Sequence, residues 1–216
     1  MPTPTVENYL KALLALRDET GRVSISDLSK SLGISTPSAN SMVKKLRDQG
    51  LVKYEKYRPL ELTDTGRRQA ALVVRKHRLT EMFLVERMGF GWEEVHAIAE
   101  QIEHVDSPGF FARMDELMDY PTTDPHGSPI PDPEGNILPQ NYRRLSDCSP
   151  GETVTVAALA HSSNDFLHLM NAREIGLETT VEIHHKEAFD GSLTVSYPGH
   201  ERVAFSKIVG DRILVR

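Results

Sequence analysis

The sequence predicts a mainly helical protein with a smaller β-rich part at its C-terminal end. Apolar residues recur at helical spacing up to about residue 118, a segment rich in proline and glycine follows at 121–139, and short β-rich runs come after it. These changes predict three domains, at residues 1–64, 65–140 and 141–216, with the proline-rich segment as the linker that closes the second.

The composition describes a globular chain rather than a membrane protein. The 216 residues are 39% hydrophobic, which is enough for more than one modest core. No apolar run approaches the ~20 residues that a membrane span needs, and the first residues do not resemble a secretory signal. We therefore expect no membrane partner and a cytoplasmic location. The single cysteine, Cys148, cannot form an internal disulfide, which agrees with a reducing compartment.

The first domain has the pattern of a helix-turn-helix. Apolar spacing predicts helices over 6–17, 24–32 and 36–49. Gly33 ends the second of these helices, and Pro37 lies in the first turn of the third. Two short helices joined by a tight turn that contains glycine make a helix-turn-helix, the motif that places one helix in a DNA groove.

A predicted wing and a local positive charge follow the third helix. Residues 51–63 contain two β-rich runs around a turn at 57–59, which predicts a hairpin. The chain has a net charge of −6, yet its basic residues gather within 35–58, opposed there only by Asp48 and Glu55. They are Lys44, Lys45, Arg47, Lys53, Lys56 and Arg58. A positive surface beside a helix-turn-helix and a wing predicts a contact with double-stranded DNA.

The middle domain is predicted to be helical and to form a dimer. Helices are expected over 64–88, 92–105 and 108–118, with Gly89 ending the first and Ser107 capping the third. Together they have more apolar surface than a small winged domain can cover. We therefore expect a homodimer, whose two heads would match two half-sites of a DNA operator.

The last domain is predicted to be a small β-barrel. Five β-rich runs separated by glycine and proline are the natural strands of such a barrel, with one helical interruption near 165–174. The runs cover residues 151–159, 178–185, 191–199, 201–208 and 211–216.

Two stripes of imidazoles and carboxylates mark the middle domain. In the run VHAIAEQIEHV (95–105), all of its histidines and glutamates fall on one stripe at ~100° per residue, beside an apolar arc. They are His96, Glu100, Glu103 and His104. The preceding helix places His77 and Glu81 four residues apart, also on one face. A solvated charged face is the simpler interpretation of one stripe, but two complementary stripes favour metal binding.

The types of ligand indicate which metal ions would fit. Carboxylates gathered without a counter-charge repel one another and raise their own pKa values, and divalent ions cancel that repulsion. Imidazole and carboxylate groups without thiolates suit Mn²⁺ or Fe²⁺ better than a structural zinc ion. If the two helices pack antiparallel, His77 and Glu81 could meet His96, and the remaining groups would form a second site, giving two sites per subunit.

Three segments resemble a known family. The runs RKHRLTE (75–81), VHAIAEQIEHV (95–105) and DPHGSPIP (124–131) are similar to those of the diphtheria-toxin-repressor and manganese-transport-repressor family of metal-dependent transcription regulators. The resemblance covers nearly the whole chain. It implies a winged helix-turn-helix, a helical dimerisation domain and an SH3-like third domain similar to the iron-transport accessory protein A (FeoA) domain.

The resemblance also implies ligand sets for the two metal sites. The first would contain His77, Glu81 and His96, with Asp165 of the barrel as an added ligand, and the second Asn8, Glu100, Glu103 and His104. Glu100 stands where iron-responding members carry cysteine, which favours Mn²⁺. Asn8 departs from the methionine or aspartate usual in the family, and Lys11 stands where some manganese-responding members have glutamate. An amide oxygen can coordinate a metal but supplies no charge.

For DNA, the resemblance implies a small set of contact residues. The side chains expected at the major groove are Ser35, Pro37, Ser38, Asn40 and Ser41. Arg58 would lie on the wing near phosphate or the minor groove, while Lys44 and Lys45 would contact phosphates. Because small polar side chains read few base edges directly, DNA shape is expected to matter.

The expected function is a metal-dependent regulator that represses metal-uptake genes by binding a palindromic operator as a dimer when Mn²⁺ or Fe²⁺ is bound. The alternative is a dimetal carboxylate enzyme, because Glu93 and His96 form an E-x-x-H motif. The other such motif, Glu182 to His185, lies in a strand-like run, and no nucleophile or phosphate-loop motif is found. We therefore expect no enzymatic activity.

Overall fold

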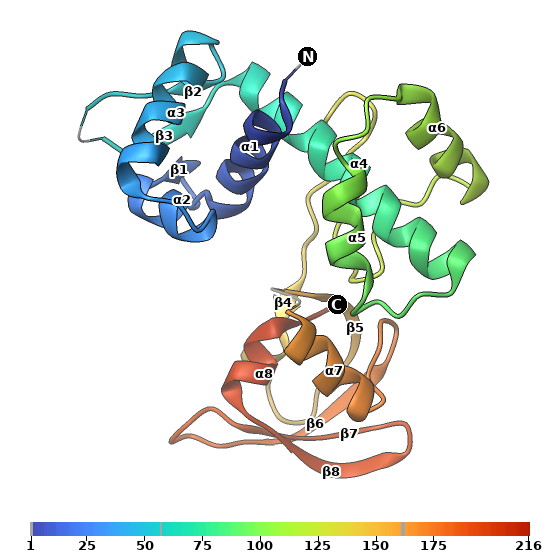
Figure 1. Ribbon diagram of the computed structural model, residues 1–216. Helices are drawn as coiled ribbons and strands as arrows, with labels where there is room; N and C mark the ends of the chain where they lie inside the picture. The colour runs from blue at the N-terminus through green and yellow to red at the C-terminus, as the bar shows by residue number, and fades with distance from the viewer. Residues whose placement is uncertain (1, 57, 161–162) are drawn as a thin grey trace. The chain divides into compact units, whose positions relative to one another are not determined.

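A computed structural model describes residues 2–56, 58–160 and 163–216 (Figure 1). The chain divides into two compact units, each of which is discontinuous in sequence. Unit 1 holds residues 1–80, 99–120 and 130–138, and unit 2 holds residues 81–98, 121–129 and 139–216. Within the described residues, no helix has both the length and the apolar character that crossing a membrane requires.

Three helices form the N-terminal part of unit 1, which is called the head below. A side-chain hydroxyl group caps the start of each helix. They are α1 (Pro4–Leu16), α2 (Ile25–Ser31) and α3 (Thr36–Asp48). The hydroxyl groups of Thr3, Ser24 and Ser35 each accept a hydrogen bond from the backbone N–H three residues later. Such caps satisfy N–H groups that would otherwise lack a partner at a helix start. The predicted helix-turn-helix is present, and Pro4 starts α1 two residues earlier than expected.

The wing is a small antiparallel sheet. β2 (Val52–Lys53) pairs with β3 (Leu60–Leu62), as the predicted hairpin requires. β1 (Arg22–Val23) pairs with the other side of β3 and was not expected, because two residues are too few to show an alternating pattern. Tyr57, in the predicted turn of the hairpin, lies outside the described residues.

An apolar core lies beneath the head and fixes which face of α3 is exposed. Its most deeply buried members include Leu10, Leu13, Leu28, Val43, Leu46 and Leu60. On α3 the inward residues are Ala39, Val43 and Leu46. This spacing is that of one helical face, so the polar and basic residues of α3 point outward.

Three further helices were predicted between residues 64 and 118. They are α4 (Asp64–Met88), α5 (Val95–Ile102) and α6 (Pro108–Leu117). α4 ends at Gly89, whose φ of 74° suits glycine. α5 is shorter than predicted, because residues 92–94 form a turn in which the N–H of Gly91 donates to the carboxylate of Glu94. In unit 1, an ion pair between Arg75 and Asp115 joins α4 to α6.

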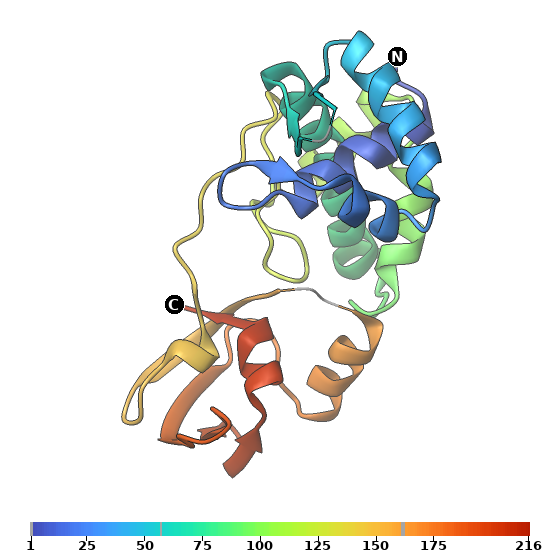
Figure 2. The same ribbon diagram turned by 90° about the vertical axis from the view of Figure 1, so that its left-hand side faces the viewer.

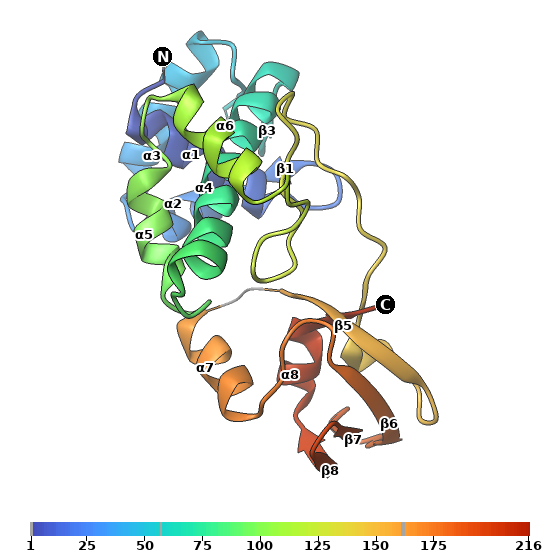
Figure 3. The same cartoon turned by 90° about the vertical axis from the view of Figure 1, so that its right-hand side faces the viewer.

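Unit 2 contains a six-stranded antiparallel sheet with the strand order β4-β9-β5-β6-β7-β8. The strands are β4 (Arg143–Arg144), β5 (Thr153–Leu159), β6 (Thr180–Lys186), β7 (Leu193–Tyr197), β8 (His200–Phe205) and β9 (Ile213–Val215). Two helices, α7 (Asn164–Ala172) and α8 (Lys207–Arg212), accompany them, with a single 3-10 turn at Leu145–Asp147. Figures 2 and 3 show these two helices, in orange and red, from two sides.

The β-rich runs predicted from the sequence correspond to β5 through β9. β4 was not predicted, and residues expected to extend two of the runs form α8 instead. The hydroxyl of Ser206 accepts a hydrogen bond from the N–H of Val209 and so caps α8. The core beneath the sheet is apolar, with Val156, Met170, Val181, Ile183, Val195 and Ile213 fully buried.

Gly66, in the first turn of α4, allows this helix to start against the wing. A Cβ atom at residue 66 would lie 2.0 Å from the backbone oxygen of Leu51. We expect Gly66→Ala to lower the free energy of unfolding by about 1–3 kcal/mol, because backbone must move to admit the methyl group. Gly109, in the first turn of α6, has open space around its Cα. Gly109→Ala should be neutral or slightly stabilising, and equal losses in urea denaturation of the two variants would contradict this account.

Candidate metal centres and DNA-binding face

The outer face of α3 carries the residues predicted to contact DNA. Ser35, Pro37, Ser38, Ser41, Lys44 and Lys45 are exposed, and so is Arg58 on the wing. Asn40 is half-buried, because its carbonyl accepts a hydrogen bond from the Tyr54 hydroxyl at 3.2 Å and its amide donates to the Thr36 carbonyl. Both ends of the Asn40 amide are therefore held by the head itself, and its role in reading bases stays a prediction.

A hollow of about 550 Å³ opens between α3 and the wing. Three basic residues contribute to its lining: Lys44 from α3, and Lys56 and Arg58 from the wing. Tyr54 and Thr36 also line the hollow and were not singled out in the sequence. The basic side chains give the hollow the charge needed to receive a phosphate group.

In unit 1, Lys11 on α1 forms ion pairs with Glu100 on α5 and with Glu103, which directly follows this helix. The ammonium of Lys11 donates to one oxygen of Glu100 at 2.5 Å and to both oxygens of Glu103 at 2.7 and 2.8 Å. Glu103 also contacts Nδ1 of His77 on α4 at 2.6 Å. Burial raises the pKa of Glu103, but its hydrogen bonds with His77 and Lys11 outweigh that effect and leave this pKa below its usual value.

Another α1 residue, Glu7, faces the same region. Glu7 contacts Nδ1 of His104 at 2.6 Å, and Nε2 of that imidazole lies 3.7 Å from Glu103. The side-chain oxygen of Asn8 is buried and has no hydrogen-bond partner among the described residues. A buried oxygen without a donor is what a cation would satisfy. The ligand set Asn8, Glu100, Glu103 and His104 stays a prediction.

Unit 2 holds a second group, which centres on Glu81. Glu81, Asp124 and His126 are all at most 5% exposed. One potential ligand atom from each lies within 4.8 Å of the others. His96 adds its Nδ1, which is 3.2 Å from Glu81. Nδ1 of His126 is 3.9 Å from one Glu81 oxygen and 4.0 Å from one Asp124 oxygen. These two distances from His126 exceed hydrogen-bond length.

The backbone fixes the orientation of His126. Its Nε2 lies 2.9 Å from the carbonyl oxygen of Trp92. Because a carbonyl only accepts, Nε2 is a donor in this contact, and Nδ1 is the ring nitrogen that faces Glu81 and Asp124. A hydrogen bond on the far imidazole nitrogen is the usual way in which proteins orient a histidine ligand.

A hydrogen bond holds the segment that carries Asp124 and His126 against β5 of the sheet. One oxygen of Asp124 accepts hydrogen bonds from the N–H groups of His126 and Ser128, and the carbonyl of His126 accepts from Leu159 on β5. Gly127 has a φ of 84°, and a Cβ there would lie 2.2 Å from the backbone oxygen of Ala157. Only glycine fits this position, so part of the predicted linker is a rigid element of the site.

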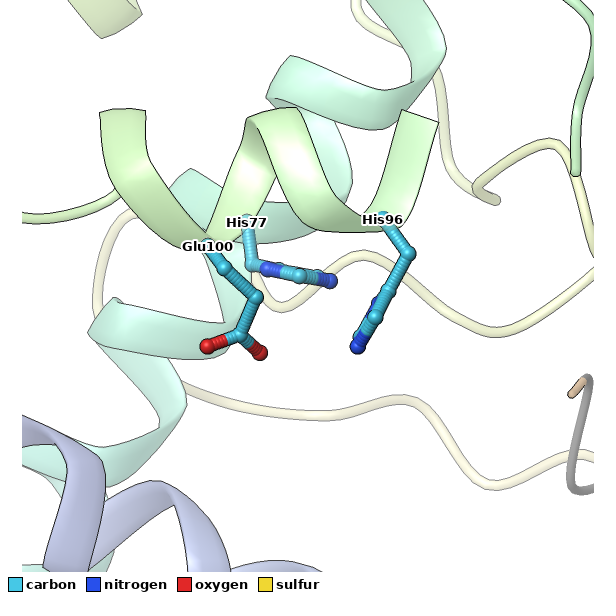
Figure 4. Close-up of side chains that lie close together, drawn as sticks. All are labelled: His77, His96 and Glu100. Atoms are coloured by element: carbon cyan, nitrogen blue, oxygen red, sulfur yellow. The ribbon is translucent and has the colours of Figure 1, made fainter. Parts of the chain in front are cut away.

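The ligand sets implied by the family resemblance remain predictions. In the structure, not every predicted ligand lies beside the members of its own set. Glu81 lies beside His96, while His77 bonds to Glu103. Figure 4 shows His77 from α4 close to His96 and Glu100 from α5, a further candidate ligand group. Asp165 is exposed in the first turn of α7 and belongs to neither candidate group found among the described residues.

Asp124 and His126 are the candidate ligands that the helical stripes could not indicate. They lie in the run DPHGSPIP (124–131), within the segment predicted to be a linker. A signal was present, because an aspartate three residues before a glycine is typical of a turn closed by the aspartate side chain. Such a turn can place a nearby histidine as firmly as a helix does.

A winged helix-turn-helix with a basic outer face, combined with buried clusters of imidazoles and carboxylates, defines a DNA-binding regulator that responds to a metal ion. Family models agree in three segments: an iron-dependent repressor N-terminal DNA-binding domain at residues 1–60, an iron-dependent repressor metal-binding and dimerisation domain at 63–132, and a FeoA domain at 143–216. The chain belongs to this family of metal-dependent transcriptional repressors.

Individual relatives support the assignment over most of the chain. The iron-dependent repressor IdeR of Mycobacterium tuberculosis is 32% identical over 209 residues, which cover 92% of this chain and 91% of that protein. The regulator MntR of Geobacillus kaustophilus is 36% identical over 120 residues, covering 56% of this chain and 84% of the relative. The structure of a manganese-dependent transcriptional repressor in complex with manganese is 33% identical, with a TM-score of 0.87 over 97% of this chain and 98% of the other.

These relationships confirm several predictions. The winged head, the helical dimerisation domain and the SH3-like FeoA domain are those expected, and DNA and a second copy of the chain are the partners of such a protein. The dimetal enzyme alternative finds no support, because the relatives are repressors and not enzymes.

The exposed lysines of α3 should make DNA binding depend on salt. We expect Lys44→Ala and Lys45→Ala each to reduce the slope of log K against log salt concentration by about 1, because each lysine would release one counterion from the DNA. The measurement is fluorescence anisotropy of a labelled duplex at several salt concentrations. Arg202→Ala removes the same charge from an exposed position on β8 and should leave the slope unchanged. A similar decrease with Arg202→Ala would show a general charge effect instead.

The single tryptophan should report occupancy of the Glu81 site. The ring of Trp92 stacks on that of His126, with centroids 6.0 Å apart. Titration with Mn²⁺ should therefore change the emission of Trp92, and His126→Ala should remove the high-affinity part of that change. Glu103→Gln alters the cluster between α1 and α5 instead, so this variant should keep the high-affinity change in Trp92 emission. An identical titration in wild type and His126→Ala would contradict metal binding beside Trp92.

Proposed function

We propose that this protein represses metal-uptake genes when Mn²⁺ or Fe²⁺ fills two sites in each subunit, and that it then binds a palindromic operator as a dimer. Mn²⁺ is the favoured ion, because the proposed ligands are carboxylate, amide and imidazole groups. The proposal includes domains at 1–64, 65–140 and 141–216, and a cytoplasmic location, where the DNA lies.

The observation that carries the proposal is the convergence of Glu81, Asp124 and His126. Burying two carboxylates side by side is costly unless a positive charge joins them. A divalent ion bound by these three residues, with His96 beside them, would supply that charge. The orientation of His126 by the Trp92 carbonyl supports this role, because it leaves Nδ1 able to accept an ion.

Asn8, Glu100, Glu103 and His104 are the proposed ligands of the second site. His77 bonds to Glu103 and would orient that carboxylate. The unsatisfied oxygen of Asn8 supports a role for this residue as a ligand, although its amide adds no charge. When bound, the ion supplies two positive charges to a cluster that is otherwise rich in carboxylate.

The proposed switch depends on where these ligands lie in the chain. Asn8 belongs to α1 of the winged head, whereas Glu100 belongs to α5 of the dimerisation domain. An ion held by both would restrain the head in one position. Moving a population from 1:99 to 99:1 requires the ion to favour the DNA-binding state by about 5.5 kcal/mol, which two ions per subunit can provide.

DNA recognition is proposed to combine phosphate contacts with limited reading of bases. Lys44, Lys45 and Arg58 would contact phosphates or the minor groove. Ser35, Pro37, Ser38, Asn40 and Ser41 would face the major groove. Their small side chains favour contacts with thymine methyl groups and recognition of DNA shape.

The decisive experiment measures DNA binding and metal content in the same samples. Sequences bound by the full-length protein are first selected from a random duplex pool in Mn²⁺. Binding to the selected duplex should be lost on chelation and should weaken at least about tenfold in His126→Ala and Glu81→Gln, corresponding to about 1.4 kcal/mol. His185→Ala removes an exposed imidazole from β6 and should bind like the wild type.

Two results would contradict the proposal. One is tight binding to the selected duplex that chelation does not change. The other is fewer than two Mn²⁺ ions bound per subunit at saturation, measured from the electron paramagnetic resonance signal of the free ion. Replacing Mn²⁺ with Fe²⁺ under anaerobic conditions would then establish which ion gives tighter DNA binding.

A further inference from the structure

Lys11 provides the cluster between α1 and α5 with a positive charge of its own. Its ammonium contacts three carboxylate oxygens, one from Glu100 and both from Glu103, at 2.5 to 2.8 Å. The Lys11 side chain is 20% exposed and that of Glu100 38%, whereas Glu103 is fully buried. A buried carboxylate needs a partner, and Lys11 is a cation that the chain itself supplies to Glu103.

The position of Lys11 brings it into conflict with the proposed metal ligands. Lys11 lies three residues after Asn8, so the two residues are neighbours on one face of α1. The carboxylate oxygens that accept hydrogen bonds from Lys11 are the oxygens that would coordinate an ion at the second site. The same lone pairs cannot hold a close ammonium and a divalent ion together, because the two cations also repel each other.

We propose that Lys11 is a built-in competitor for the second metal site: it holds Glu100 and Glu103 together in the metal-free protein and must be displaced when a divalent ion binds there. This inference rests on the proposed function and adds a regulatory residue to it. Displacement is sterically simple, because the partly exposed side chain of Lys11 can swing toward solvent.

The competition sets the metal concentration at which the protein responds. The Glu81 site has a histidine already oriented toward its carboxylates, while the site on α5 must first give up an ion pair. The Glu81 site should therefore fill at lower metal concentration. The second ion, which would join α1 to α5, should bind only when metal is abundant, and repression should follow that second event.

The test compares full-length wild type with Lys11→Gln and Lys11→Met, with Mn²⁺ alone as the probe. Equilibrium titration followed by electron paramagnetic resonance should resolve a tighter and a weaker class of sites. Removing the competitor should tighten the weaker class by about tenfold or more and leave the tighter class unchanged. Lys11→Met keeps the apolar stem of the side chain, so it serves if Lys11→Gln folds poorly.

Thermal melting provides a readout that metal affinity alone does not. The metal-free variants should melt below the metal-free wild type, because Glu100 and Glu103 lose their counter-charge. At saturating Mn²⁺ the difference should disappear, because the ion replaces Lys11. Lys76→Gln is the matched control: it removes a charge 3.8 Å from Glu7 in the same unit, and it should change Mn²⁺ affinity by less than about twofold.

The possible failures are distinguishable. If both Lys11 variants bind Mn²⁺ with the wild-type affinity or more weakly, or melt below wild type by equal amounts with and without Mn²⁺, then Lys11 is structural and this inference is wrong while the proposed function stands. If wild type and variants all fail to bind Mn²⁺ and Fe²⁺, the proposed function and this inference both fail.

Discussion

The structure depends on how two buried carboxylates are neutralised. Glu103, at the end of α5, and Glu81, on α4, are each almost inaccessible to water. A charge buried in this way destabilises a fold unless it meets an opposite charge or several donors. Within unit 1, Lys11 and His77 meet this need for Glu103, and within unit 2 His96 and His126 lie beside Glu81. Each of these carboxylates must therefore lie beside a cation of the chain or beside a site that can bind a cation from solution. This requirement determines which side chains lie next to each carboxylate.

The DNA-binding head satisfies a different constraint. Its apolar core fixes the inward face of α3 and thereby determines which side chains face outward. Side-chain caps at Ser24 and Ser35 define where the two helices of the motif start, so the recognition face is set by local chemistry close to it. The connection between the head and the buried carboxylates lies in α1, which contributes Leu10 and Leu13 to the core of the head and Lys11 to the ion pairs with Glu100 and Glu103. Helix α1 thus takes part in both the core of the head and the ion pairs of the glutamates. A change at the polar face of α1 acts on the head through the apolar face of the same helix, which packs in the core.

Much of this arrangement could be predicted because it follows helical periodicity. The stripe of His96, Glu100, Glu103 and His104, and the pair His77 and Glu81, are visible as spacings of three and four residues. Asp124 and His126 follow no period, since their positions come from a turn closed by an aspartate and from the contact of Gly127 with the backbone of β5. The two-residue strands β1 and β4 also lack a periodic signal. The contact of Lys11 with Glu103 joins residues 92 positions apart, and no local pattern encodes such a pairing.

The fixed proton on His126 has a kinetic consequence. Because Nε2 donates to the Trp92 carbonyl, the ring need not turn before its Nδ1 receives an ion. At the proposed site beside Glu81, capture of an ion would then be limited mainly by diffusion and by removal of water from the ion. At the α5 cluster an ammonium group has to leave first, which adds an activation step. A sudden rise in metal would thus be registered in two phases, so that a brief fluctuation ends before the slower phase begins and only a sustained rise is transmitted to the DNA.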